Sequence, residues 1–262
     1  MRPPYIGITD FMNVEQVNAM LEIMKAHPKS LRPRRLHVGV MMSYKTLNGL
    51  PTKWSAAFPR NEDVAAIFGN AAAMNCLHYA DYDAVDVAAN FARANGFGSN
   101  NILTQLHGIT ALQLDMAWPN PDHISKALEA AGKEIELIVQ VGKHAIEEAQ
   151  GDAQEIARRL RAYEKIAHHV LLDKSMGKGL GMDATGLLPF LRAIRDTLPD
   201  IGLVAAGGLG PTSMDLVVPL LEEFPDISID AQGKLRPSGN ALEPIDWNMA
   251  TGYLTAALRL LP

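Results

Sequence analysis

Short apolar runs alternate along the chain with longer segments in which apolar residues recur at helical spacing. The runs that predict β-strands are residues 5–9, 36–42, 75–81, 110–116, 136–141, 168–173, 202–208 and 227–232. The segments that predict helices are residues 13–27, 61–68, 84–95, 122–132, 152–165, 184–198, 212–224 and 245–261. A predicted strand is therefore followed by a predicted helix throughout the sequence.

This alternation predicts an α/β fold in which helices cover a parallel sheet. Eight strand–helix pairs in 262 residues favour closure into a single (β/α)₈ TIM barrel over residues 1–262, because such barrels commonly need about 250 residues. No low-complexity linker divides the chain, so we expect one domain. An open, doubly wound parallel sheet is the alternative.

The longest irregular stretch follows the second predicted strand and reads "SYKTLNGLPTKWSAAFPR". A loop longer than about 12–15 residues in a compact domain is usually functional or disordered. In a barrel this loop lies at the C-terminal face, where active sites are built. Its side chains Lys45, Lys53, Trp54, Phe58 and Arg60 predict a lid over an anionic ligand. The alternative is an insertion whose aromatic residues have no such role.

Composition excludes several classes of partner. The formal charge is −5 and no block of Lys and Arg occurs, so we expect neither nucleic acid nor an anionic membrane as a partner. The lone cysteine, Cys76, excludes an intrachain disulfide and a cysteine-rich metal site. No apolar run approaches the roughly 20 residues of a membrane span, so we expect a cytoplasmic protein. No cofactor and no metal are expected, and a homodimer is left open.

Polar residues finish most of the predicted strands. In chain order they are Asp10, Ser43, Tyr79, Asp81, Gln113, Asp115, Gln140, Lys143, His144, Asp173, Lys174, Asp230 and Gln232. Residues two apart on a strand share a face, so Gln113 projects with Asp115, and Asp230 with Gln232. Several carboxylates in one barrel mouth shift one another's pKa and can make one of them a proton donor. The alternative for each aspartate is a pair with a neighbouring lysine or a helix cap.

The segment "VAAGGLGPTSMDL" predicts a phosphate site. Small residues let the backbone approach a ligand closely, and a predicted helix begins directly afterwards. In barrels, phosphate commonly binds at the loops after the seventh and eighth strands. The candidate phosphate-binding residues are Gly207, Gly208, Leu209, Gly210, Gln232 and Gly233. A plain glycine turn is the alternative.

Five strand ends together resemble the phosphoribosylanthranilate isomerase family, of the tryptophan-biosynthesis branch of phosphate-binding barrels. The matching segments are "PYIGIT", "QLDM", "LLDKSMGKGLGMD", "AAGGLGPTSM" and "SIDAQGKLRP". They are short, but they occur in the family's order and cover nearly the whole chain. The first and the third together are the more specific, because the glycine motif is shared among phosphate-binding barrels.

The resemblance implies an Amadori rearrangement in which an aspartate is the general acid and a cysteine the general base. Asp173 matches the aspartate, whereas Ile6 occupies the position of the cysteine and cannot accept a proton. General-base catalysis contributes about 10²–10⁴-fold, so a substitute base is needed, and we suspect Asp10, Asp115 or Asp81. Arg60 resembles the family's carboxylate-binding arginine. Gln113 and Asp230 are the other candidate substrate-binding residues.

The expected function is therefore an isomerase acting on a small phosphorylated sugar or sugar-amine, with Asp173 as acid and Asp10 or Asp115 as its partner. Two alternatives stand beside it. A phosphosugar lyase or aldolase would form a Schiff base on Lys174 or Lys143, or hold a divalent cation between Asp81, Asp115 and Asp230. A barrel that binds a phosphorylated ligand without catalysis is the other.

Overall fold

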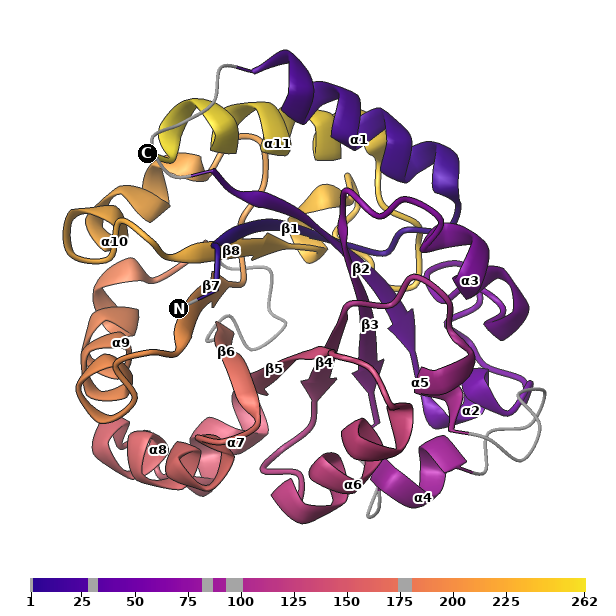
Figure 1. Cartoon of the computed structure of the whole chain (residues 1–262). Coiled ribbons are helices and arrows are strands. Elements are labelled where there is room, and N and C mark those ends of the chain that lie inside the picture. Colours follow the sequence, from indigo (N-terminus) through magenta and orange to yellow (C-terminus); the bar gives the residue numbers. More distant parts are fainter. Residues whose placement is uncertain (1, 28–32, 82–86, 93–100, 174–180) are drawn as a thin grey trace.

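The computed structural model describes residues 2–27, 33–81, 87–92, 101–173 and 181–262. Eight parallel strands close into a barrel in chain order, so the (β/α)₈ prediction is confirmed and the open sheet is excluded (Figure 1). The strands are β1 Tyr5–Thr9, β2 Arg35–Met42, β3 Met74–Ala80, β4 Ala111–Asp115, β5 Glu136–Val141, β6 Ala167–Asp173, β7 Gly202–Ala206 and β8 Ser228–Ala231.

Helices surround the barrel on the outside, as Figure 1 shows. The α-helices are α1 Val14–Ala26, α2 Tyr44–Leu47, α3 Val64–Ile67, α4 Val87–Ala92, α5 Ile102–Gln105, α6 Pro121–Ala131, α7 Lys143–Glu148, α8 Ala153–Leu160, α9 Ala184–Thr197, α10 Val218–Glu223 and α11 Trp247–Leu260. Within the described residues, four short 3₁₀ helices accompany them: η1 Asn61–Asp63, η2 Arg161–Tyr163, η3 Met214–Val217 and η4 Gly233–Leu235. No helix in the described part of the chain is long and apolar enough to cross a membrane.

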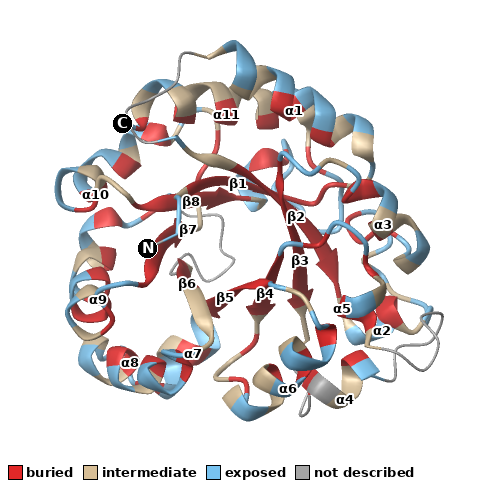
Figure 2. Ribbon diagram, viewed as in Figure 1, coloured by how far each residue is buried: buried red, intermediate tan, exposed pale blue. Residues whose placement is uncertain are grey.

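Alternate residues of each strand face opposite sides of the barrel wall. Ile6 and Ile8 belong to a large apolar cluster with helix residues such as Val17 and Met20, which places them between the barrel and its helices. A second, smaller cluster contains Tyr5, Met74, Cys76, Ala111, Ile138, Leu171, Val204 and Ala206, and fills the barrel interior. Figure 2 shows the same division, with buried strands and helices buried on the side that faces them.

Polar side chains close the barrel at its N-terminal end. Arg35 binds both carboxylate oxygens of Glu136, at 2.6 and 2.8 Å, and Glu136 also lies 3.1 Å from the ring of His169. Tyr5 stacks on His37, with ring centroids 4.7 Å apart. Burial lowers the pKa of His37 to about 3, so this imidazole is uncharged at neutral pH. The interior below the mouth is therefore packed with side chains and is not an open pore.

Candidate active site at the barrel mouth

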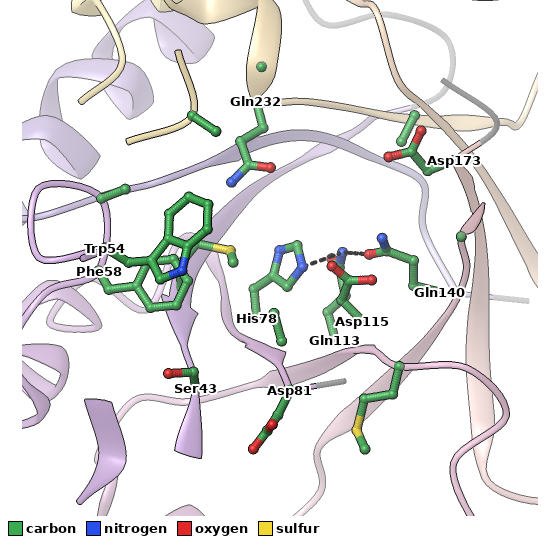
Figure 3. A pocket seen from close by; sticks show the side chains of 18 of the residues that line it. Ser43, Trp54, Phe58, His78, Asp81, Gln113, Asp115, Gln140, Asp173 and Gln232 are labelled. Carbon is green, nitrogen blue, oxygen red and sulfur yellow. Dashed lines mark hydrogen bonds between the residues drawn. The ribbon is translucent and has the colours of Figure 1, made fainter. Parts of the chain in front are cut away.

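A cavity of about 1350 Å³ opens at the C-terminal ends of β2 to β8. Figure 3 shows Trp54 and Phe58 on one side of it and Asp173 on the opposite side. The candidate site residues that line it are Gln113, Asp115, Asp173, Gly207, Gly208, Asp230, Gln232 and Gly233. These eight residues come from four strand ends far apart in sequence, which the barrel brings together.

Asp230 lies on the cavity floor and is 5% exposed. Thr9 Oγ1 donates a hydrogen bond to its Oδ2 at 3.3 Å, and no partner of Oδ1 is found in the described residues. Burial raises the pKa of the Asp230 carboxyl to about 7; hydrogen bonds from Thr9 and the Ala231 backbone oppose the rise, and Asp10 and Asp173 add to it when they are ionised. A carboxyl with its pKa raised into this range can both take and return a proton near neutral pH.

Gly7 makes room for this carboxyl. A Cβ atom at Gly7 would lie 2.3 Å from Asp230 Oδ1, closer than any van der Waals contact allows. The strand register pairs Gly7 with Asp230 directly. The motif "GIT" thus has a steric role here, since any side chain larger than that of glycine at its first position would clash with the Asp230 carboxyl.

Ile6 is not where a base could act. It is fully buried in the cluster between the barrel and the helices, whereas its neighbour Gly7 faces the interior. A cysteine at Ile6 would therefore lie outside the barrel wall. Cys76 does face the interior, but burial raises the pKa of its thiol well above its usual range, which fits packing better than proton transfer.

Asp10 is withdrawn from the cavity. It is buried and forms an ion pair with Arg236, and it accepts a hydrogen bond from Gln232 Nε2 at 3.1 Å. Burial raises the pKa of the Asp10 carboxyl, while Arg236 and Gln232 oppose that rise. Asp115 and Asp81 remain in the wall of the cavity, and Asp81 accepts a hydrogen bond from Tyr79 Oη at 2.9 Å.

A row of hydrogen-bonded polar side chains crosses the cavity wall from β3 to β5. Gln113 Nε2 donates to Gln140 Oε1 at 2.8 Å and lies 3.3 Å from His78 Nε2, as the dashed lines of Figure 3 show. Burial lowers the pKa of His78 to about 3, so this imidazole is uncharged at neutral pH.

Side chains of the loop after β2 line one side of the cavity. Trp54 stacks on Phe58 at 5.8 Å between ring centroids, and Lys53 Nζ lies 5.3 Å from the Trp54 ring. Met41, Ala57 and Phe58 anchor the loop in a small buried cluster. Lys45 and Lys53 line the cavity, whereas Arg60 lies outside it and pairs with Glu62 and Asp63 on the surface. The structure therefore does not bring Arg60 into the site.

The turns after β7 and β8 abut at the mouth. Gly207 and Gly208 both have positive φ angles, 92° and 72°, which favour glycine. Gly233 and Lys234 line the cavity beside them, and a Cβ atom at Gly210 would lie 3.0 Å from that of Lys234. Leu209 is buried in the apolar core, and Ser213 Oγ accepts the Gly210 N–H at 2.9 Å. Of the predicted phosphate residues, Gly207, Gly208, Gln232 and Gly233 therefore face the cavity, and Leu209 and Gly210 do not.

Neither alternative chemistry gains support from the geometry. Lys143 lines the cavity, and its Nζ forms an ion pair with Glu147 Oε1 at 3.7 Å. Lys174 lies outside the described residues. Among the described residues no group of three or more His, Cys, Asp or Glu side chains is arranged to hold a metal ion.

Two residues of this site have no counterpart in the sequence predictions. The sequence alone suggests a core or rim position for His78, and it gives Arg236 no role within the segment "SIDAQGKLRP". The inward alternation of β3, with Cys76 and Ala80, could have identified His78. Nothing in the sequence pairs Arg236 with Asp10, since 226 positions separate them.

Fold and site together define a parallel (β/α)₈ barrel with a carboxylate-rich cavity at its C-terminal face. No family model and no curated protein matches the sequence. Among solved structures, the chain is similar to a threonine-to-alanine variant of pyruvate carboxylase from Rhizobium etli, crystallised without acetyl coenzyme A. The TM-score is 0.47 and the identity 12%, over 98% of this chain and 28% of that one. The chain thus spans under a third of that protein's length, and the likeness carries no argument about function.

Proposed function

We propose that this protein is an isomerase that transfers protons within a small phosphorylated sugar or sugar-amine. In the reactive form the two carboxyls carry one proton between them: it lies on Asp173, which acts as the acid, while Asp230 is ionised and acts as the base. The observation that carries the proposal is the position of Asp230. Its buried carboxyl lies on the cavity floor, and its pKa is raised to about 7. In the register of the barrel, Asp230 on β8 and Asp173 on β6 both pair with Ala206 on β7. Asp230 takes the part for which the sequence suggested Asp10 or Asp115.

The proton balance of such a reaction fits two carboxyls. Asp173 gives a proton to the ring oxygen as the sugar ring opens, and Asp230 removes one from the carbon next to the imine. The resulting enaminol then tautomerises to the ketone. The substrate gains and loses one proton, so neither an oxidant nor a second substrate is required. The phosphate rests against Gly207, Gly208 and the Gln232–Lys234 turn, where backbone N–H groups and Lys234 supply positive potential.

Proton transfer can be tested before the natural substrate is identified. The protein is incubated in D₂O with a panel of ribose phosphates and phosphoribosylamines, and products are followed by NMR and mass spectrometry. An isomerase yields a ketose of unchanged carbon skeleton with deuterium beside the new carbonyl. Cleavage into smaller fragments would show a lyase instead, and saturable binding without deuterium exchange would show a non-catalytic barrel.

A further inference from the structure

A buried ion pair ties the end of β1 to the turn after β8. Asp10 follows β1, Arg236 follows η4, and the two side chains are each about 1% exposed. Arg236 uses its remaining donors on the backbone: Nε donates to Glu243 O at 2.6 Å and Nη1 to Gln232 O at 3.1 Å. Gln232 Nε2 in turn donates to Asp10 Oδ1 at 3.1 Å. Asp10, Arg236 and Gln232 thus form a closed triangle of hydrogen bonds.

The backbone at Asp10 is strained in a way that requires such support. Its φ angle is 88°, a left-handed conformation that residues with a Cβ rarely adopt. The N–H groups of Asp10 and Phe11 both donate to Gly39 O, at 3.0 and 3.2 Å. A strained acidic residue persists only where its surroundings hold it, and here β2 holds the backbone while Arg236 holds the carboxylate.

The side of the triangle that faces the cavity is the proposed anion-binding turn. Gln232, Gly233 and Lys234 line the cavity, directly after the carbonyl to which Arg236 donates. Arg236 borders the cavity, but each of its side-chain nitrogens donates to a protein acceptor and the side chain is only about 1% exposed. We therefore expect Arg236 to influence ligand binding through the turn.

We propose that Arg236 is a positioning residue, which through Asp10 and the Gln232 carbonyl holds the Gln232–Lys234 turn in the conformation that receives the anionic end of the substrate. This inference rests on the phosphate subsite of the proposed function, not on its chemistry. A guanidinium is suited to the task because its planar fork serves three acceptors at once, whereas an ammonium group serves as a point charge.

The test measures the affinity for inorganic phosphate by calorimetry, with thermal unfolding recorded for each variant. Arg236→Met should weaken phosphate binding by about 10-fold to 100-fold, as expected when a binding turn is displaced by about 1 Å. Arg236→Lys keeps the positive charge beside Asp10 but cannot reach both carbonyls. It should recover part of the lost thermal stability and little of the phosphate affinity. The double variant Asp10→Asn/Arg236→Met leaves no buried charge unpaired. Its phosphate affinity should nevertheless be reduced as much as that of Arg236→Met.

Arg35→Met is the matched control, because it breaks the Arg35–Glu136 pair at the opposite end of the barrel. It should lower stability and leave phosphate affinity unchanged. Wild-type affinity in Arg236→Lys would overturn the inference, since charge alone would then explain binding, and so would a wild-type protein that binds no phosphate. Phosphate binding that depends on Arg236, together with no turnover on the sugar panel, would support the inference and reject the isomerase.

Discussion

Asp173 on β6 and Asp230 on β8 are both register partners of the same residue, Ala206 on the intervening strand β7. Neighbouring strands lie about 4.8 Å apart, so the two backbones are separated by roughly 10 Å. Asp230 is buried and Asp173 half-buried, and the small side chain of Ala206 leaves the space between them open to the cavity. In the proposed isomerase, the reacting sugar carbon is held between these two carboxyls.

Replacement of Asp230 should remove turnover while the ligand still binds. Asp230→Asn keeps the shape of the side chain and removes its ability to accept a proton, so kcat should fall by about 10²–10⁴-fold. The pH dependence of kcat/KM near 7 should vanish with it, and phosphate affinity should stay within twofold or so. Steady-state kinetics from pH 5 to 9 test this, with the exposed Asp122→Asn as control. A variant that keeps its turnover would show that Asp230 is not the base.

The same carboxyl should make stability depend on pH. Its folded pKa, about 7, lies above the ordinary value of 3.8, so the folded state retains a proton that the unfolded state has lost. Stability contributed by this group is therefore present below pH 4 and is lost as the pH rises to 7. The loss amounts to a few kcal/mol, on the order of 1.4 kcal/mol per pH unit. The free energy of unfolding of Asp230→Asn, relative to that of the wild type, should therefore rise from pH 5 to pH 8, as measured by urea unfolding. The same difference between variant and wild type at both pH values would contradict the raised pKa.

His37 should make stability depend on pH in the opposite direction. Its pKa is lowered to about 3, chiefly by burial, so only the unfolded state takes up a proton as the pH falls below 6.5. Stability is then lost toward acid by about 1.4 kcal/mol per pH unit. His37→Phe preserves the stack on Tyr5 and should reduce this loss, as measured by urea unfolding at pH 7.5 and 5. The exposed His107→Asn is the control. An unchanged acid dependence in His37→Phe would show that His37 is protonated in the folded state.

The strands were predictable because each is an apolar run, and β1 begins and ends where the run does, at Tyr5 and Thr9. Helix α8 also follows its prediction, with Asp152 capping it through the Gln154 N–H. By contrast α2, α5 and α7 went unpredicted, since four to six residues are too few to show helical periodicity. Helix α6 begins at Pro121, one residue before the predicted start, and Asn120 caps it.

The site could be predicted where it depends on the alternation of strand residues, and not where it depends on loops. Gln113, Asp173 and Asp230 lie in the last three residues of β4, β6 and β8 and line the cavity, which is where alternation along a strand predicts them. The same alternation places Ile6 outside the wall, which comparison of motifs alone does not reveal. Arg60 was assigned from a motif in a loop, and loop geometry turned it toward Asp63. The positive φ of Asp10, which directs it to Arg236, has no signature in its residue type.

A substitution at Gly7 tests whether activity depends on the position of the Asp230 carboxyl. A methyl group at Gly7 would meet Asp230 Oδ1 at 2.3 Å and Cγ at 2.9 Å, so Gly7→Ala must displace the carboxyl. Gly202→Ala is a closely matched control at the N-terminal end, where the methyl group would meet His169 Nδ1 at 2.1 Å. Both substitutions crowd the barrel interior, and each should cost about 1–3 kcal/mol in urea unfolding.

The two variants should differ in activity. Displacement of a catalytic group by about 1 Å can reduce the rate by about 10²-fold, so Gly7→Ala should lose turnover and shift the pH profile near 7. Gly202→Ala should keep both, because His169 pairs with Glu136 far below the cavity and touches no group of the site. Equal activity loss in the two variants would mean that general destabilisation, and not the position of Asp230, limits the reaction. Normal turnover in Gly7→Ala would remove Asp230 from the chemistry altogether.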